Sequence, residues 1–255
     1  MARLGSRNEL ISAQRWRSST GRAWRFGALL LVLCSGTLNG AASSSSVRAI
    51  WQIGYIPQNA AVDHVFYLPN TSDKPLTVTG IQTSCSCTTA GSADSTIAPG
   101  DSLALIVTFD SKRLLHSVRK TVTVTTDDST SSPALFQLEA YVLPEGEPTG
   151  IYRVTPTIIS WASSDTIGHA TGDSIAVKNL GGDPVPLRVE TCCGDCVTAM
   201  IVPTVLGGGV TEWIHLRGQR GAHADACANG SVTLYFGDTE RTIITVPIQT
   251  AHGKN

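Results

Sequence analysis

Residues 102–110, Ser-Leu-Ala-Leu-Ile-Val-Thr-Phe-Asp, decide the fold class. Large apolar side chains fall at every second position from Leu103 to Phe109, which is the period of a strand with one buried face. Residues 118–125 and 138–142 repeat this alternation, and valine and threonine, which strands favour, dominate the first of these runs. No convincing helical period follows residue 42, so the sequence predicts an all-β protein.

Turn signals separate the strand-like runs at short intervals, among them Pro99-Gly100-Asp101, Asp127-Asp128 and Ser132-Pro133. Short strands at this spacing favour a sandwich of two antiparallel sheets. The sequence Gly100-Asp101-Ser102-Leu103 also spells the tag of a hydrolase family. Because it precedes a strand here, we interpret it as a turn and not as a nucleophile.

A stretch with two prolines, two glycines and no apolar residue follows at 144–150, and the strand pattern resumes at Tyr152. The two halves also look related. One constant shift along the chain pairs Asn70 with Asn179, Pro75 with Pro184, Val78 with Leu187, and Cys87 with Cys196. We therefore predict two tandem immunoglobulin-like β-sandwich domains, at 51–143 and 151–250, with a linker at 144–150 and a tail at 251–255.

The first 42 residues carry six arginines and one acidic residue. Within them, a short apolar run, Phe26–Cys34, follows the last arginine. Nine residues cannot span a hydrocarbon core, which needs about 20. Small residues at 40–42 complete the pattern of a signal peptide, 1–42, ahead of a flexible start at 43–50. We therefore expect an exported, periplasmic or extracellular protein with no stable membrane span. Cys34 follows a bulky leucine, which disfavours lipidation.

The composition restricts the partners. Lys plus Arg number 19 and Asp plus Glu number 20, so the formal net charge is −1, without the basic excess of a nucleic-acid binder. Hydrophobic residues make up 42% of the chain, which is too many for a disordered protein. We expect protein partners, in the cell envelope or outside the cell, and no nucleic acid.

Several motifs follow one another in the first half: His64-x-Phe66, Asn70, Pro75-Leu76, Ser84-Cys85-Ser86-Cys87-Thr88, Ile97-x-Pro99-Gly100, Val107-x-Phe109-Asp110 and Thr125-Thr126-Asp127. In this order, over residues 51–142, they resemble the bacterial domain-of-unknown-function family numbered 1573. The resemblance implies an exported, Ig-like domain, similar to those of ASPM, SPD-2 and Hydin proteins, with no established enzymatic activity. This chain has Ser86 where the family usually has glycine. The second half keeps only the partial match from Asn179 to Cys196.

Cysteines are the residues that offer chemistry. Six follow the signal peptide, and an even number in an exported chain predicts disulfides. The candidates are Cys85, Cys87, Cys192, Cys193, Cys196 and Cys227. Sequence alone does not choose among the pairings, but we expect one bridge inside the second domain.

Two metal hypotheses compete with the disulfides. Cys193-x2-Cys196 followed by His223-x3-Cys227 has zinc-like spacing, although an oxidising compartment works against thiolate ligands. In Cys85-x-Cys87 the two sulfurs can bond to each other, bridge elsewhere, or stay reduced and bind Cu(I). His64 or His116 would then have to complete the site.

The residues contain no carboxylate pair and no histidine cluster that suggests general acid–base chemistry. Trp51, Trp161 and Trp213 are dispersed, and we interpret them as core or domain-edge residues. The sequence thus predicts a non-catalytic module for protein–protein interaction or envelope assembly, stabilised by disulfides, with no cofactor and no enzymatic activity. The alternative is a protein that handles thiols or metal, Cu(I) or Zn, through Cys85 and Cys87.

Overall fold

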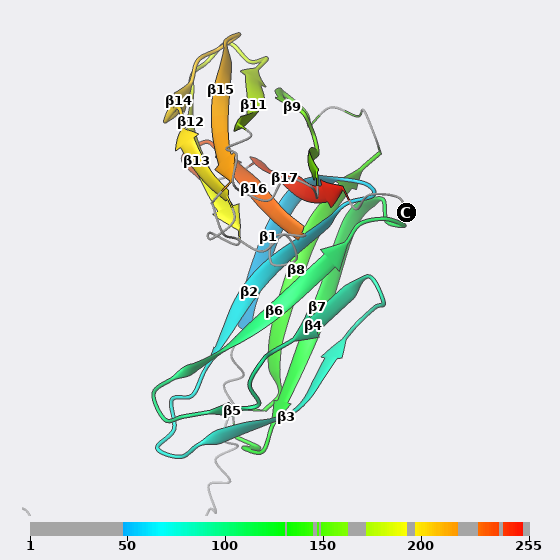
Figure 1. The fold of residues 1–255 in the computed structure, drawn as a ribbon, viewed down its shortest axis with the longest axis vertical. Coiled ribbons are helices and arrows are strands. Elements are labelled where there is room, and N and C mark those ends of the chain that lie inside the picture. The colour runs from blue at the N-terminus through cyan, green and yellow to red at the C-terminus, as the bar shows by residue number, and fades with distance from the viewer. Residues whose placement is uncertain are drawn as a thin grey trace, which may run out of the picture. The chain divides into compact units, whose positions relative to one another are not determined.

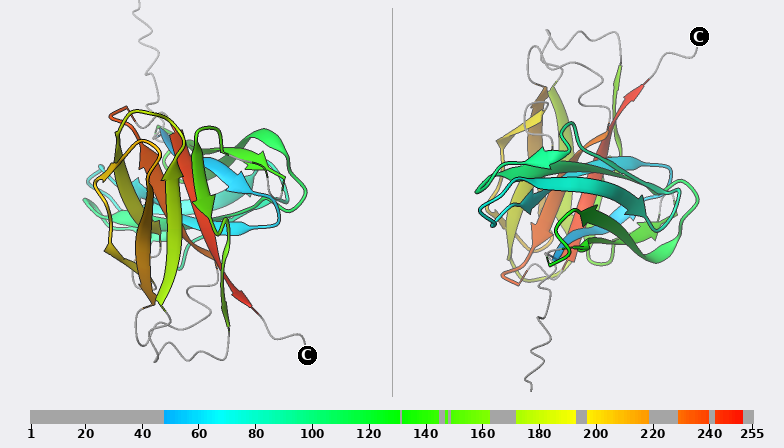
Figure 2. Two further views of the ribbon diagram at one scale, coloured as in Figure 1. Left: turned by 90° about the horizontal axis from the view of Figure 1, so that it is seen from above. Right: turned by 90° about the horizontal axis from the view of Figure 1, so that it is seen from below.

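The computed structural model of the chain describes residues 48–130, 132–144, 147, 149–162, 172–192, 197–218, 229–239 and 242–251. Every regular element in these ranges is a β-strand, and the strands form several sheets (Figures 1 and 2). The predicted all-β sandwich class is confirmed. The predicted signal peptide lies outside the described ranges, and within them no helix is long and apolar enough to cross a membrane.

The first half is a sandwich of two sheets around one core. Its strands are β1 (Arg48–Pro57), β2 (Ala61–Pro69), β3 (Leu76–Thr83), β4 (Thr88–Gly91), β5 (Thr96–Ile97), β6 (Ser102–Asp110), β7 (His116–Thr126) and β8 (Ala134–Leu143). One sheet has the order β2-β6-β4, and the other runs β1-β8-β7-β3-β5. The predicted alternation holds in β6, where every second residue from Leu103 to Phe109 is buried. These side chains meet Phe66 and Phe136 in the core.

The second half has its own core, which includes Ile175, Ile214, Leu234 and Phe236. Its strands are β9 (Tyr152–Thr155), β10 (Ile159–Ala162), β11 (Gly172–Asn179), β12 (Val185–Cys192), β13 (Val197–Ile201), β14 (Val205–Leu206), β15 (Thr211–Gly218), β16 (Asn229–Phe236) and β17 (Thr242–Ala251). One sheet has the order β13-β15-β11-β9, and the other strands follow the order β14-β12-β16-β17.

The same pairing pattern occurs in both halves. In the first, β6 pairs with β2 and β4, β7 pairs with β3 and β8, and β8 pairs in parallel with β1. In the second, β15 pairs with β11 and β13, β16 pairs with β12 and β17, and β17 pairs in parallel with β10. The shift that aligns the two half-sequences therefore corresponds to a repeated strand order.

A buried asparagine fixes the same corner in each half. The Asn70 Nδ2 group donates to the carbonyl oxygens of Lys74 (2.7 Å) and Ile97 (2.9 Å), and its Oδ1 accepts from the amide of Ser72 (3.0 Å). The Gly100 amide donates to the Asn70 carbonyl oxygen at 2.9 Å. One side chain thus satisfies several backbone groups that burial would otherwise leave unpaired.

Asn179 makes the corresponding contacts in the second half. Its Nδ2 group donates to the carbonyl oxygens of Asp183 (2.8 Å) and Leu206 (3.5 Å), and its Oδ1 accepts from the amide of Gly181 (2.9 Å). The Gly209 amide donates to the Asn179 carbonyl oxygen at 2.9 Å. The sequence repeat of these asparagines therefore reflects a repeated hydrogen-bonding role.

Strand β1 links the two cores. It pairs in parallel with β8 along its length and with β17 at Tyr55 and Ile244. The Thr245 hydroxyl donates to the Ile53 carbonyl oxygen at 2.7 Å. Gly54 has a φ of +69°, and a Cβ placed there would lie 2.2 Å from the Ile243 carbonyl oxygen. Glycine is therefore required at this close approach.

The structure differs from the predicted boundaries at two points. The flexible start was expected to reach residue 50, but β1 begins at Arg48 because Arg48, Ala49 and Ile50 pair with residues of β8. The tail was expected to begin at residue 251, but Ala251 is the last residue of β17, where it pairs with Ala162.

Candidate functional site

The two predicted cysteines lie at the corner where the chain passes from β3 in one sheet to β4 in the other. The Ser84 amide donates to the Thr121 carbonyl oxygen, and the Thr121 amide donates to the Ser84 hydroxyl, both at 3.0 Å. The Asp110 amide donates to the Cys87 carbonyl oxygen at 2.9 Å. The corner is therefore held to β7 on one side and to β6 on the other.

Cys85 and Cys87 form a disulfide with each other, with their Cα atoms 5.2 Å apart. Both residues are half-buried, and Ser86 between them is exposed. The hydroxyl oxygen of Thr88, a residue only 2% exposed, lies 3.5 Å from the Cys85 sulfur and 3.9 Å from the Cys87 sulfur. Of the three outcomes that the sequence left open, the structure has the mutual bond.

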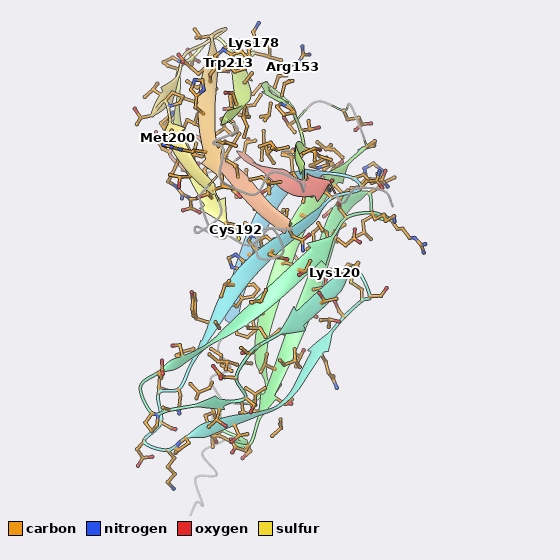
Figure 3. All side chains as sticks on the ribbon, in the orientation of Figure 1. Lys120, Arg153, Lys178, Cys192, Met200 and Trp213 are labelled. Carbon is orange, nitrogen blue, oxygen red and sulfur yellow. A yellow bond between two sulfur atoms is a disulfide. The ribbon has the colours of Figure 1, made fainter. Side chains whose placement is uncertain are left out.

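Three cationic residues share a hollow with this disulfide. Lys112, Arg113 and Lys120 line a hollow of about 420 Å³ together with Cys85, Ser86, Cys87, Asp110 and Leu114. Figure 3 labels Lys120 on this part of the first half. The Asp110 carboxylate, the one acidic group of the lining, accepts a hydrogen bond from the Lys112 amide at 2.8 Å. The hollow is thus more positive than negative.

The disulfide closes a loop of three residues, because its cysteines are two positions apart. In the chain-entropy model such a loop stabilises the fold by about 1.5 kcal/mol, against about 3 kcal/mol for a loop of 15 residues. Both halves also have a full core without it. The bond is therefore a weak structural brace, whereas its exposure makes it accessible to chemistry.

Of the other predicted cysteines, only Cys192 lies among the described residues. Cys192, at the end of β12, has its sulfur 2.8 Å from the Asp63 carbonyl oxygen. The remaining disulfide and zinc candidates, Cys193, Cys196, His223 and Cys227, lie outside the described residues. Within the described ranges, no group of three or more Cys, His, Asp and Glu side chains is arranged to hold a metal ion.

The two histidines considered as further ligands have other contacts. His64 stacks on Trp51 with ring centroids 4.7 Å apart and meets the edge of Phe66 at 4.6 Å. Burial lowers the pKa of His64 to about 4, although the nearby Glu190 carboxylate acts in the opposite direction. The Nδ1 atom of His116 lies 3.4 Å from the hydroxyl oxygen of Tyr141.

The hydrolase tag lies in a turn, as predicted. Gly100 has a φ of +78°, and β6 begins at Ser102, which is exposed. The serine therefore precedes its strand and has none of the strand-to-helix geometry that such a nucleophile requires.

A second surface was missed by the sequence analysis. Trp213, expected in the core or at a domain edge, is 53% exposed on the outer face of the sheet β13-β15-β11-β9 (Figure 3). Ile214 and Leu216 alternate with it and take the buried positions of β15. Met200, at a bulge of β13, is 55% exposed.

The outer face of this sheet is also basic. Lys178 on β11 lies directly opposite Arg153 on β9. Ala176, two residues before Lys178 and on the same face of β11, lies opposite Trp213. Within the described part of the chain, neither cation has an ion pair with a carboxylate. Like charges directly opposite each other in a sheet are destabilising, so this pair costs the free chain stability.

Sequence patterns could have indicated part of both sites. Lys120 immediately precedes Thr121, which is hydrogen-bonded to Ser84 at the corner. That contact depends on the register of β3 and β7, which the sequence does not reveal. The outward position of Trp213 follows from the period of two once Ile214 is assigned to the core. Nothing in the sequence places Arg153 opposite Lys178, because the order of β9 and β11 is a tertiary feature.

Comparison with solved structures gives distant likenesses. A protein of unknown function from Porphyromonas gingivalis W83 is 15% identical, with a TM-score of 0.36, over 81% of this chain and 97% of that chain. The Pseudomonas aeruginosa CupB2 chaperone is 11% identical, with a TM-score of 0.29, over 80% of this chain and 97% of that chain. The YadV chaperone is 13% identical, with a TM-score of 0.29, over 80% and 96%.

No curated protein matches the sequence. A family match covers nearly all of the first half, from β1 to most of β8, and includes the Cys85–Cys87 corner. Residues 46–142 match the family described as "Protein of unknown function (DUF1573)", which confirms the resemblance predicted from the motifs of the first half.

Proposed function

We propose that this chain is an exported, non-catalytic β-sandwich module that binds a protein partner in the cell envelope or outside the cell. The observation that carries the proposal is the outer face of the sheet β13-β15-β11-β9, where exposed Trp213 on β15 neighbours β11, whose Lys178 lies opposite Arg153 of β9. Exposed Met200 belongs to β13, at the other edge of the sheet. We call this surface the Trp213 face. It combines a tryptophan and an arginine, two residue types that are enriched in protein interfaces, with a second cation.

The charge arrangement indicates the chemistry of the partner. Lys178 and Arg153 repel each other in the free chain, and a carboxylate between them would turn that repulsion into two attractions. Trp213 provides a large side chain with few rotatable bonds, so it loses little conformational entropy on binding. The Trp213 face therefore fits an acidic segment of a protein that also buries the indole.

The test begins in the cell that makes the protein. A photo-crosslinking amino acid is placed at Trp213, and at exposed Thr79 in the first half as a control, and the adducts are identified by mass spectrometry. We expect a discrete protein adduct from position 213 that is absent from position 79. Adducts to glycan or lipid alone, or the same adducts from both positions, would contradict the proposal.

The identified partner is then titrated with purified variants. We expect Trp213→Ala to weaken binding by at least about tenfold, as loss of a central aromatic anchor does. The double substitution Arg153→Glu with Lys178→Glu should weaken it further and remove its salt dependence. Lys74→Glu reverses an exposed charge in the first half and serves as the matched control, with an expected change below about twofold.

Export is tested separately, because the proposal requires it. We expect the mature protein in the periplasmic or extracellular fraction, with an intact mass that begins at Ser43 and carries no lipid on Cys34. A chain found in the cytoplasm with residues 1–42 intact would remove the export part of the proposal and leave the binding part to be judged on the crosslinking.

A further inference from the structure

The Cys85–Cys87 corner has a feature that a binding module does not need, namely a half-exposed disulfide in a cationic hollow. The described residues place Lys112, Arg113 and Lys120 around it, and none of the three has an ion pair with a carboxylate there. Cations beside a cysteine stabilise its thiolate, the form that leaves and attacks in thiol–disulfide exchange. The surroundings of this bond therefore favour its opening.

The hydroxyl of Thr88 distinguishes the two sulfurs. It lies 3.5 Å from the Cys85 sulfur and 3.9 Å from the Cys87 sulfur, and the residue is buried. A hydroxyl can donate to a thiolate formed beside it, and the donor is already in position before the bond opens. Cys85 is therefore the better leaving group, and Cys87 is the sulfur that an incoming thiolate attacks.

The backbone keeps this arrangement when the bond opens. Hydrogen bonds from Ser84 to Thr121 and from Asp110 to Cys87 hold the corner to two strands of different sheets. The disulfide itself adds little stability, because the loop that it closes is so short. The reduced corner can therefore keep its fold, which a redox-active pair requires.

We propose that the Cys85–Cys87 disulfide is a thiol–disulfide exchange site for dithiols that carry negative charge, such as a cysteine pair in an acidic protein segment. The hollow supplies the positive charge that would attract such a segment, and Ser86 leaves the bond open to solvent. This activity is separate from binding at the Trp213 face.

The exchange balances without a further reactant. A substrate thiolate attacks the Cys87 sulfur, the Cys85–Cys87 bond breaks, and its electron pair leaves on the Cys85 sulfur. The second substrate thiolate attacks the substrate sulfur of the mixed disulfide, and that electron pair leaves on the Cys87 sulfur. The substrate dithiol is oxidised to a disulfide, the cysteine pair is reduced, and the two protons lost by the substrate reach the cysteines through water.

The charge preference is tested on the purified full chain with three small thiols. Mercaptoacetate is anionic, 2-mercaptoethanol neutral and cysteamine cationic. Reduction is followed by alkylation and mass spectrometry of the peptide that contains Cys85 and Cys87, and each rate is corrected for the thiolate fraction. At low salt we expect mercaptoacetate to react at least about tenfold faster than cysteamine, as electrostatic steering gives. High salt should remove this ratio.

Variants assign the effect to the corner. The triple substitution Lys112→Gln, Arg113→Gln and Lys120→Gln should bring the ratio of the two rates to about one, whereas the control Lys74→Gln should keep it. Thr88→Val removes the hydroxyl at nearly constant volume and should slow reduction by all three thiols severalfold. Circular dichroism of each variant checks that the fold is kept.

The mixed disulfide formed early in the reduction shows which sulfur is attacked. When the reaction of the full chain with mercaptoacetate is quenched with an alkylating maleimide and analysed by tandem mass spectrometry, we expect mercaptoacetate on Cys87 and the maleimide on Cys85. The reverse placement would overturn this assignment. Reduction that is independent of thiol charge and concentration and that follows global unfolding would overturn the proposal and leave a structural crosslink. A pair isolated from its own compartment in the reduced state with stoichiometric copper would overturn it in favour of metal binding. Neither result depends on whether the Trp213 face binds a protein.

Discussion

The two halves place an aromatic side chain at the same point of their outer faces, but on opposite strands. In the first half Tyr67 on β2 lies opposite Ala104 on β6. At the equivalent positions of the second half, Ala176 on β11 lies opposite Trp213 on β15. Tyr67 is 64% exposed and Trp213 is 53% exposed. The strand pair is repeated, while the side chain that it presents to solvent is not.

The buried corners show the opposite behaviour. Asn70 and Asn179 occupy the same position and make the same kinds of hydrogen bond, because the backbone groups around them would be unpaired in either half. The need to pair buried backbone groups therefore keeps the same residue at both corners, whereas exposed positions differ between the halves. Functional differences between the halves should therefore be sought at surface positions where the described residues differ, above all at the Trp213 face of the second half.

The largest effect is expected where the two halves meet. In Gly54→Ala the new Cβ would lie 2.2 Å from the Ile243 carbonyl oxygen, at a φ of +69°. Steric overlap and backbone strain together should lower the free energy of unfolding by about 4 kcal/mol. The measurement is urea unfolding of variants that keep either Trp51 or Trp213 and have the other tryptophans replaced by phenylalanine. The two fluorescence transitions should separate when β1 and β17 no longer hold together.

Gly100→Ala is the matched control for this substitution. Gly100 has a φ of +78°, but a Cβ placed there has no atom within 4 Å. Only backbone strain remains, and the expected cost is about 1 kcal/mol. If Gly54→Ala cost no more than Gly100→Ala, the close approach of β1 to β17 would not contribute to stability.

The next largest effect compares the two asparagine corners. Asn70→Ala removes the side-chain donor to the buried carbonyl oxygen of Ile97 and one of two donors to the Lys74 carbonyl oxygen, the other being the Ser72 hydroxyl, and should cost about 3 kcal/mol. Asn179→Ala should cost about 2 kcal/mol, because its contact with the Leu206 carbonyl oxygen is already long at 3.5 Å. Unfolding of each variant in urea measures both costs. If Asn179→Ala lost as much free energy of unfolding as Asn70→Ala, or more, hydrogen-bond length would not explain the relative stability of the two corners.

The fold was largely predictable because it depends on patterns that are local in the sequence. The period of two in residues 102–110 and the repeated asparagines need only neighbouring residues to be recognised. The junction of the halves was not predictable, since Tyr55 and Ile244 are far apart in the sequence and pair in parallel. The Cys85–Cys87 corner was half predictable: the cysteines are evident, but Thr88 and Lys120 matter only through the geometry of three strands.

A smaller effect is expected from His64 of the first half. Burial lowers the pKa of His64 to about 4 in the folded chain, against about 6.5 when unfolded. Between these values the unfolded chain binds more protons, so stability is complete above about pH 6.5 and is lost as the pH falls towards 4. From pH 7 to pH 4.5 the loss due to His64 should be about 2 kcal/mol.

Comparison of urea unfolding at the two pH values with that of His64→Gln isolates this contribution, because the variant has no group that titrates there. Since His64 stacks on Trp51, the fluorescence of Trp51 should report the loss first and that of Trp213 later. If His64→Gln lost as much stability as the native chain over the same range, other groups would carry the acid sensitivity of the first half.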